Sequence, residues 1–236
     1  MKRFSALAVC VILIWIAGCT KEGNPVDGGP FNNPTVIMPL VIGNEWTYAS
    51  RSLDTAGQVT GTDTATFKIV RDTTMGVERW YFIGRDSGAW ELLTNRSDGL
   101  WYTARVSGGI RTPVLLAKYP AFVNDTFYGL DSVFVTVVST STPVTVPAGS
   151  FTCYEYREDP PPGGTQVSRF FPPGKGFVRD DFRGRTPGGQ SYLRSQRNLV
   201  YLVLRKEPGG ASGGASAETR RGAGEGRPAS WLMPLR

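Results

Sequence analysis

The sequence predicts an all-β domain over residues 36–205, and three observations support this fold class. Apolar and polar residues alternate in short segments that are rich in β-branched and aromatic residues. Clusters of Gly, Pro, Asn and Asp separate these segments, and no segment combines a helical period with capping residues. A meander of roughly ten strands must curl to cover its apolar face, so we expect a curved antiparallel sheet or a partly closed β-barrel, with a β-sandwich as the alternative.

The first half of the domain alternates most plainly at its start. Residues 44–48 place Trp46 and Tyr48 on the same face of a strand, because side chains two positions apart point the same way. Asp98-Gly99 is a strong turn signal between two later strands. The strands and extended segments expected in this half are 44–48, 64–70, 78–83, 89–93, 100–106 and 113–119, with turns at 53–58, 72–76 and 95–99.

The second half contains the clearest strand, at residues 131–140, where β-branched residues follow one another closely. Residues 160–164 are three prolines and two glycines, which exclude a strand and predict a loop. Pro147-Ala148-Gly149 fits a type II turn except that Gly lies one position late, so a bulged turn is the alternative. The strands expected in this half are 131–140, 151–156, 166–171, 176–182 and 191–204.

Residues 1–18 have the layout of a secretory signal. Lys2 and Arg3 precede an uncharged apolar run that is too short to span a bilayer, since a spanning helix needs about 20 apolar residues. The run ends in Ile16-Ala17-Gly18-Cys19, which resembles the lipobox of bacterial lipoproteins. That resemblance implies that Cys19 receives a diacylglyceryl group, becomes the first mature residue and anchors the protein to a membrane. The alternatives are an uncleaved membrane helix and a secretory signal with an incidental cysteine.

The residues that follow the lipobox predict a location and a tether. Thr20 stands where, in Gram-negative lipoproteins, an Asp tends to hold the protein in the inner membrane, so the outer membrane is favoured in an organism that has one. Residues 19–35 are dense in Gly, Pro and Asn and are expected to form a flexible tether. Residues 206–236 are mostly Gly, Ala, Ser and charged residues, and we expect them to be disordered. Trp231-Leu232-Met233 in this tail is either a docking peptide or an accident of a loosely constrained terminus.

Composition excludes several classes of chemistry. The 236 residues include no histidine, which removes Ser-His-Asp and Cys-His arrangements and the usual zinc sites. Of the 3 cysteines, Cys10 leaves with the leader and Cys19 takes the lipid, so Cys153 has no disulfide partner and is expected to be buried. The formal charge of +6 falls to +4 when Lys2 and Arg3 leave, and the basic residues are scattered. Nucleic acid is therefore not an expected partner, and no cofactor or metal is predicted.

Three stretches of the domain share a pattern. Residues 39–48 read PLVIGNEWTY (the opening motif), residues 146–154 read VPAGSFTCY (the turn motif), and residues 170–178 read FFPPGKGFV (the glycine motif). In this order they resemble the PL-x-x-GN-x-W-x-Y, VPAG-T/S-F-x-C and G-x-G-x-V segments of bacterial envelope domains that are often lipid-anchored. The resemblance implies a β-rich exported domain, and it transfers neither an activity nor functional residues.

Other candidate sites have simpler interpretations. Gly174-Lys175-Gly176 lacks the Ser or Thr and the following helix of a phosphate-binding loop, so a tight turn is expected. The carboxylates of Asp180 and Asp181 could serve a glycosidase-type or calcium site. Alternation sends these two side chains to opposite faces, so we expect solvated charges there, as also at Glu155, Glu158 and Asp159. The aromatic residues, Trp80, Trp90 and Trp101 among them, either line a ligand pocket or, as we favour, fill the core.

These observations favour a lipid-anchored cell-envelope protein whose β-domain is not catalytic and serves for binding or a structural role. One alternative is a carrier that holds a lipid or another hydrophobic ligand in a half-open barrel. A filled core would favour the first hypothesis, and a large apolar cavity would favour the carrier. A carboxylate-based hydrolase is the third and weakest alternative, because it needs acids that converge in a cleft. The expected partners are a membrane, through Cys19, and an envelope protein or hydrophobic ligand.

Overall fold

The computed structural model of the protein describes residues 35–85, 90–106, 109–110, 112–160 and 164–205. The predicted signal peptide (1–18), Cys19 with the tether up to residue 34, and the tail (206–236) lie outside these residues. The assignments of these three segments therefore remain predictions.

The described residues form one antiparallel sheet, which confirms the all-β fold class. One short 3₁₀ turn, Leu130–Ser132 (η1), is the helical element of the described part of the chain. The strands are β1 (Glu45–Leu53), β2 (Val59–Met75), β3 (Glu78–Arg85), β4 (Trp90–Arg96), β5 (Gly99–Val106), β6 (Gly109–Ile110), β7 (Val114–Lys118), β8 (Thr126–Tyr128), β9 (Phe134–Val146), β10 (Gly149–Asp159), β11 (Gln166–Phe171), β12 (Arg179–Arg185) and β13 (Ser191–Val203).

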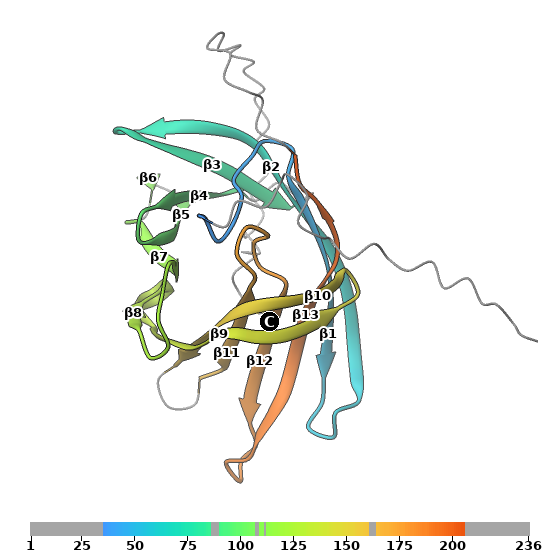
Figure 1. Ribbon diagram of the computed structural model, residues 1–236. Coiled ribbons are helices and arrows are strands. Elements are labelled where there is room, and N and C mark those ends of the chain that lie inside the picture. The colour runs from blue at the N-terminus through green and yellow to red at the C-terminus, as the bar shows by residue number, and fades with distance from the viewer. Residues whose placement is uncertain (1–34, 86–89, 107–108, 111, 161–163, 206–236) are drawn as a thin grey trace, which may run out of the picture.

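The sheet curls until its two ends almost meet (Figure 1). Its strand order is β6-β5-β4-β3-β2-β1-β13-β12-β11-β10-β9-β8, so the pairing of β1 with β13 joins the two halves of the meander. At one end β7 pairs with β5, and at the other end β8 pairs with β9. β7 contacts both β8 and η1, and the Tyr156 hydroxyl on β10 donates to the Lys118 carbonyl on β7 at 2.6 Å. The result is the predicted partly closed barrel rather than the sandwich. We call the junction of β7 and β8 the seam.

Strand β1 shows how the sequence pattern produces the barrel wall. Trp46 and Tyr48 are 0% and 1% exposed, whereas the alternate positions Glu45, Thr47 and Ala49 are only half buried. Trp46 lies directly opposite Phe67 of β2, which is also buried. Because a slip of one residue would turn every side chain of a strand to the other face, the two buried rings fix the register of β1.

The β9–β10 hairpin folds over other strands of the sheet. It crosses in front of β11 to β13 in Figure 1, and its tip is held there by the Ala148 N–H, which donates to the Leu199 carbonyl of β13 at 3.1 Å. The turn itself consists of Pro147 and Ala148, with Gly149 opening β10 opposite Val146. Pro143 is tolerated within β9 because that part of the strand pairs with β10 alone, and an edge position needs no second ladder.

Several predicted boundaries differ from the structure by a few residues, and three of these differences have identifiable reasons. The turn expected at 72–76 is strand, because β2 continues to Met75 and pairs with β3 up to a turn at Gly76 and Val77. The strand expected from residue 131 begins at Phe134, because Leu130–Ser132 forms the 3₁₀ turn η1. Residues 176–178 precede β12 instead of belonging to it. The strand β8 was not expected, since its three residues are too few to show alternation.

Candidate functional site

The opening and glycine motifs, predicted from separate parts of the sequence, lie against each other in the barrel. The indole N–H of Trp46 donates to the Lys175 carbonyl at 2.7 Å, and the Tyr48 hydroxyl donates to the Phe177 carbonyl at 2.8 Å. The rings of Tyr48 and Phe177 stack with their centroids 4.4 Å apart. Burial raises the pKa of Tyr48, so this hydroxyl stays a hydrogen-bond donor in the neutral range.

Asn44 is the polar centre of the opening motif and is fully buried. Its side-chain amide donates to the Pro39 carbonyl at 2.7 Å, and its side-chain oxygen accepts the Arg205 N–H at 2.6 Å. Asn44 therefore joins the residues before β1 to the residues after β13, at the point where the two halves of the meander meet. This contact is structural, as are the contacts of Trp46 and Tyr48.

Gly176 shows why the glycine motif needs glycine. Its backbone has a φ of +82°, and an added Cβ would lie 3.0 Å from Trp46 Nε1 and 3.1 Å from Met38 Cγ. The Gly174 and Gly176 N–H groups donate to the Val36 and Ile37 carbonyls at 2.8 and 3.0 Å. The motif is thus a tight crossing beneath the indole, as predicted, and these backbone N–H groups bind the chain itself instead of a phosphate.

A row of polar and charged side chains crosses the inner face of the barrel. Tyr156, Arg169, Asp180 and Arg197 lie directly opposite one another on β10, β11, β12 and β13. All four are buried, between 1% and 6% exposed. Arg169 Nε lies 2.9 Å from Glu158 Oε1, and Arg197 Nη1 lies 3.9 Å from Asp180 Oδ2. The acids and arginines therefore neutralise one another here. We call Tyr156, Arg169, Asp180 and Arg197, together with Glu158, the inner charged row.

Asp180 is the least well paired member of the row. Its Oδ1 has no hydrogen-bond partner in the part of the chain that the structure describes. Burial raises the pKa of Asp180 to about 6, and the nearby guanidinium groups of Arg169 and Arg197 offset this only in part. Desolvation outweighs attraction because the Arg197 contact is long and Arg169 is shared with Glu158. The pKa of Asp180 therefore lies above that of an ordinary aspartate, because burial disfavours its charged form.

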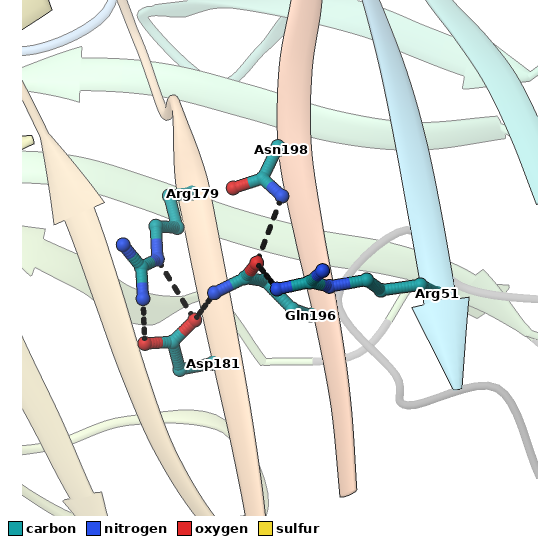
Figure 2. Close-up of polar contacts among 5 residues, drawn as sticks. All are labelled: Arg51, Arg179, Asp181, Gln196 and Asn198. Atoms are coloured by element: carbon teal, nitrogen blue, oxygen red, sulfur yellow. Dashed lines mark hydrogen bonds and ion pairs between the residues drawn. The ribbon is translucent and has the colours of Figure 1, made fainter. Parts of the chain in front are cut away.

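Asp181 points to the opposite, outer face, where a second network surrounds it (Figure 2). Arg179 donates to both of its carboxylate oxygens, at 2.9 and 2.6 Å, and the Gln196 amide donates to it at 2.8 Å. The Gln196 oxygen in turn accepts from Arg51 at 2.8 Å and from Asn198 at 3.0 Å. These five side chains link β12, β13 and β1 on the outside of the barrel.

The prediction for Asp180 and Asp181 is therefore right about their faces and wrong about their solvation. Both are buried, at 1% and 3% exposed. Their arginine and glutamine partners come from neighbouring strands, which the local sequence does not indicate. The sequence of β11 does contain a signal for the inner row. Arg169 lies two positions from the apolar Val167 and two from Phe171, so it shares their inward face.

The remaining predicted side chains have structural positions. Cys153 is buried as expected, and burial raises the pKa of its thiol to about 12, so it is inert at neutral pH. Trp80 fills a second small apolar cluster with Phe82 and Leu92, against which Trp101 packs. Only the backbone of Trp90 belongs to the described residues. Cys19, the predicted lipidation site, lies outside them.

The seam carries a group of exposed apolar side chains that the sequence analysis did not identify. Phe122, Val123, Tyr128 and Phe134 are 79%, 50%, 69% and 41% exposed. Tyr128 and Phe134 are directly opposite on β8 and β9, and their rings meet edge to face at 5.8 Å. We call these four residues the seam patch. Its sequence signal is the pair Phe122-Val123 between Pro120 and Asn124, an apolar pair where a turn predicts polar residues.

The loop that presents Phe122 is held firmly at its base. The Phe122 N–H donates to Asp125 Oδ2 at 2.9 Å, and the Asp125 N–H donates back to the Phe122 carbonyl at 3.0 Å. Lys118 Nζ lies 3.0 Å from the same carboxylate. The Phe122 N–H and Lys118 hold the pKa of Asp125 below its ordinary value. Two backbone hydrogen bonds, Asn124 N–H to the Val137 carbonyl and Val137 N–H to the Asp125 carbonyl, fasten the loop to β9.

Two other features are absent from the described ranges. No group of three or more Cys, Asp or Glu side chains there is arranged to hold a metal ion. No helix in the same residues has the length and apolar character needed to cross a membrane.

Comparison with known proteins gives distant structural similarities. The chain matches no protein-family model and no curated protein sequence. It is similar to the crystal structure of a protein assigned as a lipoprotein from Parabacteroides distasonis, with 14% identity and a TM-score of 0.44 over 72% of this chain and 99% of that one. It is also similar to an exported protein with a YmcC-like fold from Bacteroides fragilis, with 12% identity and a TM-score of 0.43 over the same shares. MucB in complex with MucA(peri) aligns with 12% identity and a TM-score of 0.30 over 71% of this chain and 52% of MucB.

Proposed function

We propose that this protein is a lipid-anchored cell-envelope protein whose β-domain binds a partner through the seam patch and does not catalyse a reaction. The observation that carries the proposal is the contrast between a barrel interior occupied by its own side chains and the exposed apolar side chains at the seam, of which Phe122 and Val123 lie on a hydrogen-bonded loop. Large apolar residues that are exposed together are candidates for interaction sites. The proposal places binding at the seam and gives the barrel a supporting role.

The anchor is assigned to Cys19 by the Ile16-Ala17-Gly18-Cys19 sequence that follows the short apolar leader. Thr20 in place of Asp favours the outer membrane in an organism that has one. The test is Cys19→Ala, which should leave a slower-migrating precursor and abolish labelling by radioactive palmitate. Palmitate labelling that persists in this variant would reject Cys19 as the lipidation site.

Two observations weigh against the alternative functions. A carrier needs space inside the barrel, but Trp46, Tyr48, Tyr156, Phe171 and Phe177 are fully buried there and contact one another or the backbone. A carboxylate-based hydrolase needs acids that converge on a substrate cleft. In the inner charged row, Glu158 pairs with Arg169 and Asp180 lies beside Arg197.

The binding role is tested by copurification from native membranes, with mass spectrometry of the proteins and lipids that accompany the chain. The double variant Phe122→Ser/Tyr128→Ser removes the two most exposed rings of the seam patch. Val77→Ser is the matched control, because Val77 is 99% exposed at the tip of the β2–β3 hairpin. We expect a copurifying protein that the double variant loses and the control retains. Equal recovery with both variants, or no copurifying protein with the wild type, would contradict the proposal.

A further inference from the structure

The β12–β13 hairpin carries exposed arginines in a stretch of sequence that has no acidic residue. Residues 182–205 include five arginines and no Asp or Glu. Arg183 and Arg185 of β12 and Arg194 of β13 are exposed, whereas Arg197 belongs to the inner charged row. Arg194 is close to Arg183 in register, because its neighbour Leu193 lies opposite Arg183. The hairpin projects at the same end of the barrel as the turn between β1 and β2 (Figure 1).

Strand register gathers these arginines with a further one on the outer face of the barrel. Arg183 and Arg185 lie two and four positions after Asp181, so their side chains share its outer face. Gln196 lies opposite Asp181, and the exposed Arg51 lies opposite Gln196. Adjacent strands are about 4.8 Å apart and residues two apart on a strand about 6.6 Å, so these positions form one surface. We call Arg51, Arg183, Arg185 and Arg194 the arginine patch.

The acidic side chains closest to the arginine patch in register are already engaged. Arg179 donates to both carboxylate oxygens of Asp181. Arg157 Nε lies 3.2 Å from Asp159 Oδ1. In the turn between β1 and β2, Asp54 accepts two backbone N–H groups of its own turn. The charge of the arginine patch is therefore not neutralised on this face, and it is available to an anionic partner.

An anionic lipid surface has the chemistry that such a patch recognises. The planar guanidinium group donates in pairs to phosphate oxygens. Clusters of about four or more basic side chains bind membranes that contain anionic lipids. An acyl anchor would hold the domain beside the headgroups, and an anchor combined with a basic patch is a common pair of membrane signals.

The length of the tether and the strand order fit this contact. The tether residues 19–34 would span at most roughly 55 Å in full extension. Along β1 the distance from Glu45 to Arg51 is only about 20 Å, so the domain can lie on its side beside its anchor. The pairing of β1 with β13 is at the centre of the strand order and the seam joins the two ends, so the arginine patch and the seam lie on opposite sides of the barrel.

We propose that the arginine patch binds the anionic headgroups of the membrane that holds the anchor, with the outer face of β12, β13 and β1 on the lipid surface. The inference rests on the proposed attachment through Cys19. The contact involves many headgroups and retains no single lipid, so it ends when detergent replaces the bilayer. It turns the seam patch away from the membrane, where a partner can reach it.

The test measures the protection of arginine side chains on vesicles. The acylated full chain is reconstituted into vesicles of phosphatidylcholine alone or with about 30% phosphatidylglycerol, treated with phenylglyoxal and analysed by mass spectrometry. We expect Arg183, Arg185 and Arg194 to react at least about threefold more slowly on the anionic vesicles, and salt at about 1 M to abolish this protection. Arg71 and Arg79, exposed on β2 and β3, are the controls and should react equally on both.

Matched variants assign the protection to the charge of the patch, with the remaining Arg51 as the reporter. Arg183→Gln/Arg185→Gln/Arg194→Gln should make the reaction of Arg51 equal on both vesicle types. Replacing the same three residues by Lys should keep Arg51 protected. Lys68→Gln/Arg71→Gln/Arg79→Gln, which removes the same charge from exposed positions elsewhere, should also keep it protected.

The other outcomes separate this inference from the anchor. A chain that associates with both vesicle types and shows equal arginine reactivity overturns the inference and leaves the attachment through Cys19 standing. Association with neither vesicle type overturns both. Equal protection by inorganic phosphate on phosphatidylcholine vesicles would indicate a site for a free anion, and protection found only in native membranes would indicate an acidic protein. Either result overturns the inference.

Discussion

The inner wall of the barrel and the seam use aromatic side chains in opposite ways. In the wall, Trp46, Tyr48 and Phe177 are fully buried. The Trp46 indole N–H and the Tyr48 hydroxyl each donate to a backbone carbonyl. At the seam, Phe122 and Tyr128 are mostly exposed, although the loop that carries Phe122 is fixed by hydrogen bonds and an ion pair and Tyr128 lies on β8. Rigid support of exposed apolar groups lowers the entropic cost of binding. We infer from this contrast that the barrel is the scaffold and that the seam is the candidate interaction surface.

The largest expected effect tests the scaffold. Trp46→Ala removes the ring at which the opening and glycine motifs meet, and it should lower the free energy of unfolding by about 3–5 kcal/mol. Trp101→Ala is the control, because Trp101 is half buried and its indole N–H pairs with an exposed Asp98. Urea denaturation measures both variants. Equal losses of unfolding free energy in the two variants would show that the contact between the opening and glycine motifs does not stabilise the fold more than the half-buried Trp101 does.

The next effect is a pH dependence from the inner charged row. Four charged groups act on the pKa of Asp180: Arg169 of β11 and Arg197 of β13 lower it, and Glu158 of β10 and Asp181 of β12 raise it. Burial prevails and raises this pKa from 3.8 to about 6, so the folded state holds the proton more tightly than the unfolded state. The stabilisation that protonated Asp180 gives to the folded state is complete below pH 4. It is lost as the pH rises to about 6, and the free energy of unfolding falls by about 3 kcal/mol over this range.

Asp180→Asn should remove this component, since an amide mimics the protonated acid at every pH. The difference in unfolding free energy between this variant and the wild type should shift in favour of the variant between pH 4 and pH 6.5. Asp181→Asn, on the outer face, should keep most of the component, because burial is the largest cause of the raised pKa of Asp180 and the charge of Asp181 is the smallest. A difference that does not vary with pH for Asp180→Asn would mean that Asp180 is ionised throughout this range.

A smaller effect separates backbone strain from steric overlap. Gly176→Ala and Gly189→Ala both place a Cβ on a residue with φ near +80°, but only the Cβ at 176 would meet the Trp46 ring. Both should lose the roughly 1 kcal/mol of a strained alanine, and Gly176→Ala should lose about 1–3 kcal/mol more from overpacking. Thermal or urea unfolding measures the two variants. The same loss of unfolding free energy in both variants would show that overlap with Trp46 does not destabilise Gly176→Ala.

The smallest expected effect is at the seam. Phe122→Ser should change the free energy of unfolding by no more than about 0.5 kcal/mol, because the ring is exposed and the loop hydrogen bonds use the backbone N–H. Phe177→Ala, at a buried ring, should cost several times as much. A large loss for Phe122→Ser would mean that the ring supports the fold, which would weaken the case for a binding surface.

The fold class and much of its wall could be predicted because alternation reports burial directly. Trp46 and Tyr48 were placed on one face of a strand, and both are buried; Cys153 was expected to be buried and is. The contacts of the opening motif with the glycine motif could not be predicted, since they join residues 129 positions apart. The partners of Asp180 and Asp181 are likewise set by strand pairing instead of local sequence. The seam patch was missed because a three-residue strand and a turn carry no period.

We propose that the barrel is filled by its own side chains and is covalently attached to lipid only through Cys19. Native mass spectrometry of the chain gently extracted from its membrane tests this proposal most directly. We expect one species, whose mass equals the polypeptide from Cys19 onward plus its covalent acyl groups, with no lipid that dissociates on activation. A chain that retains Met1 with an unmodified cysteine, or one that carries a stoichiometric non-covalent hydrophobic ligand, would contradict the claim.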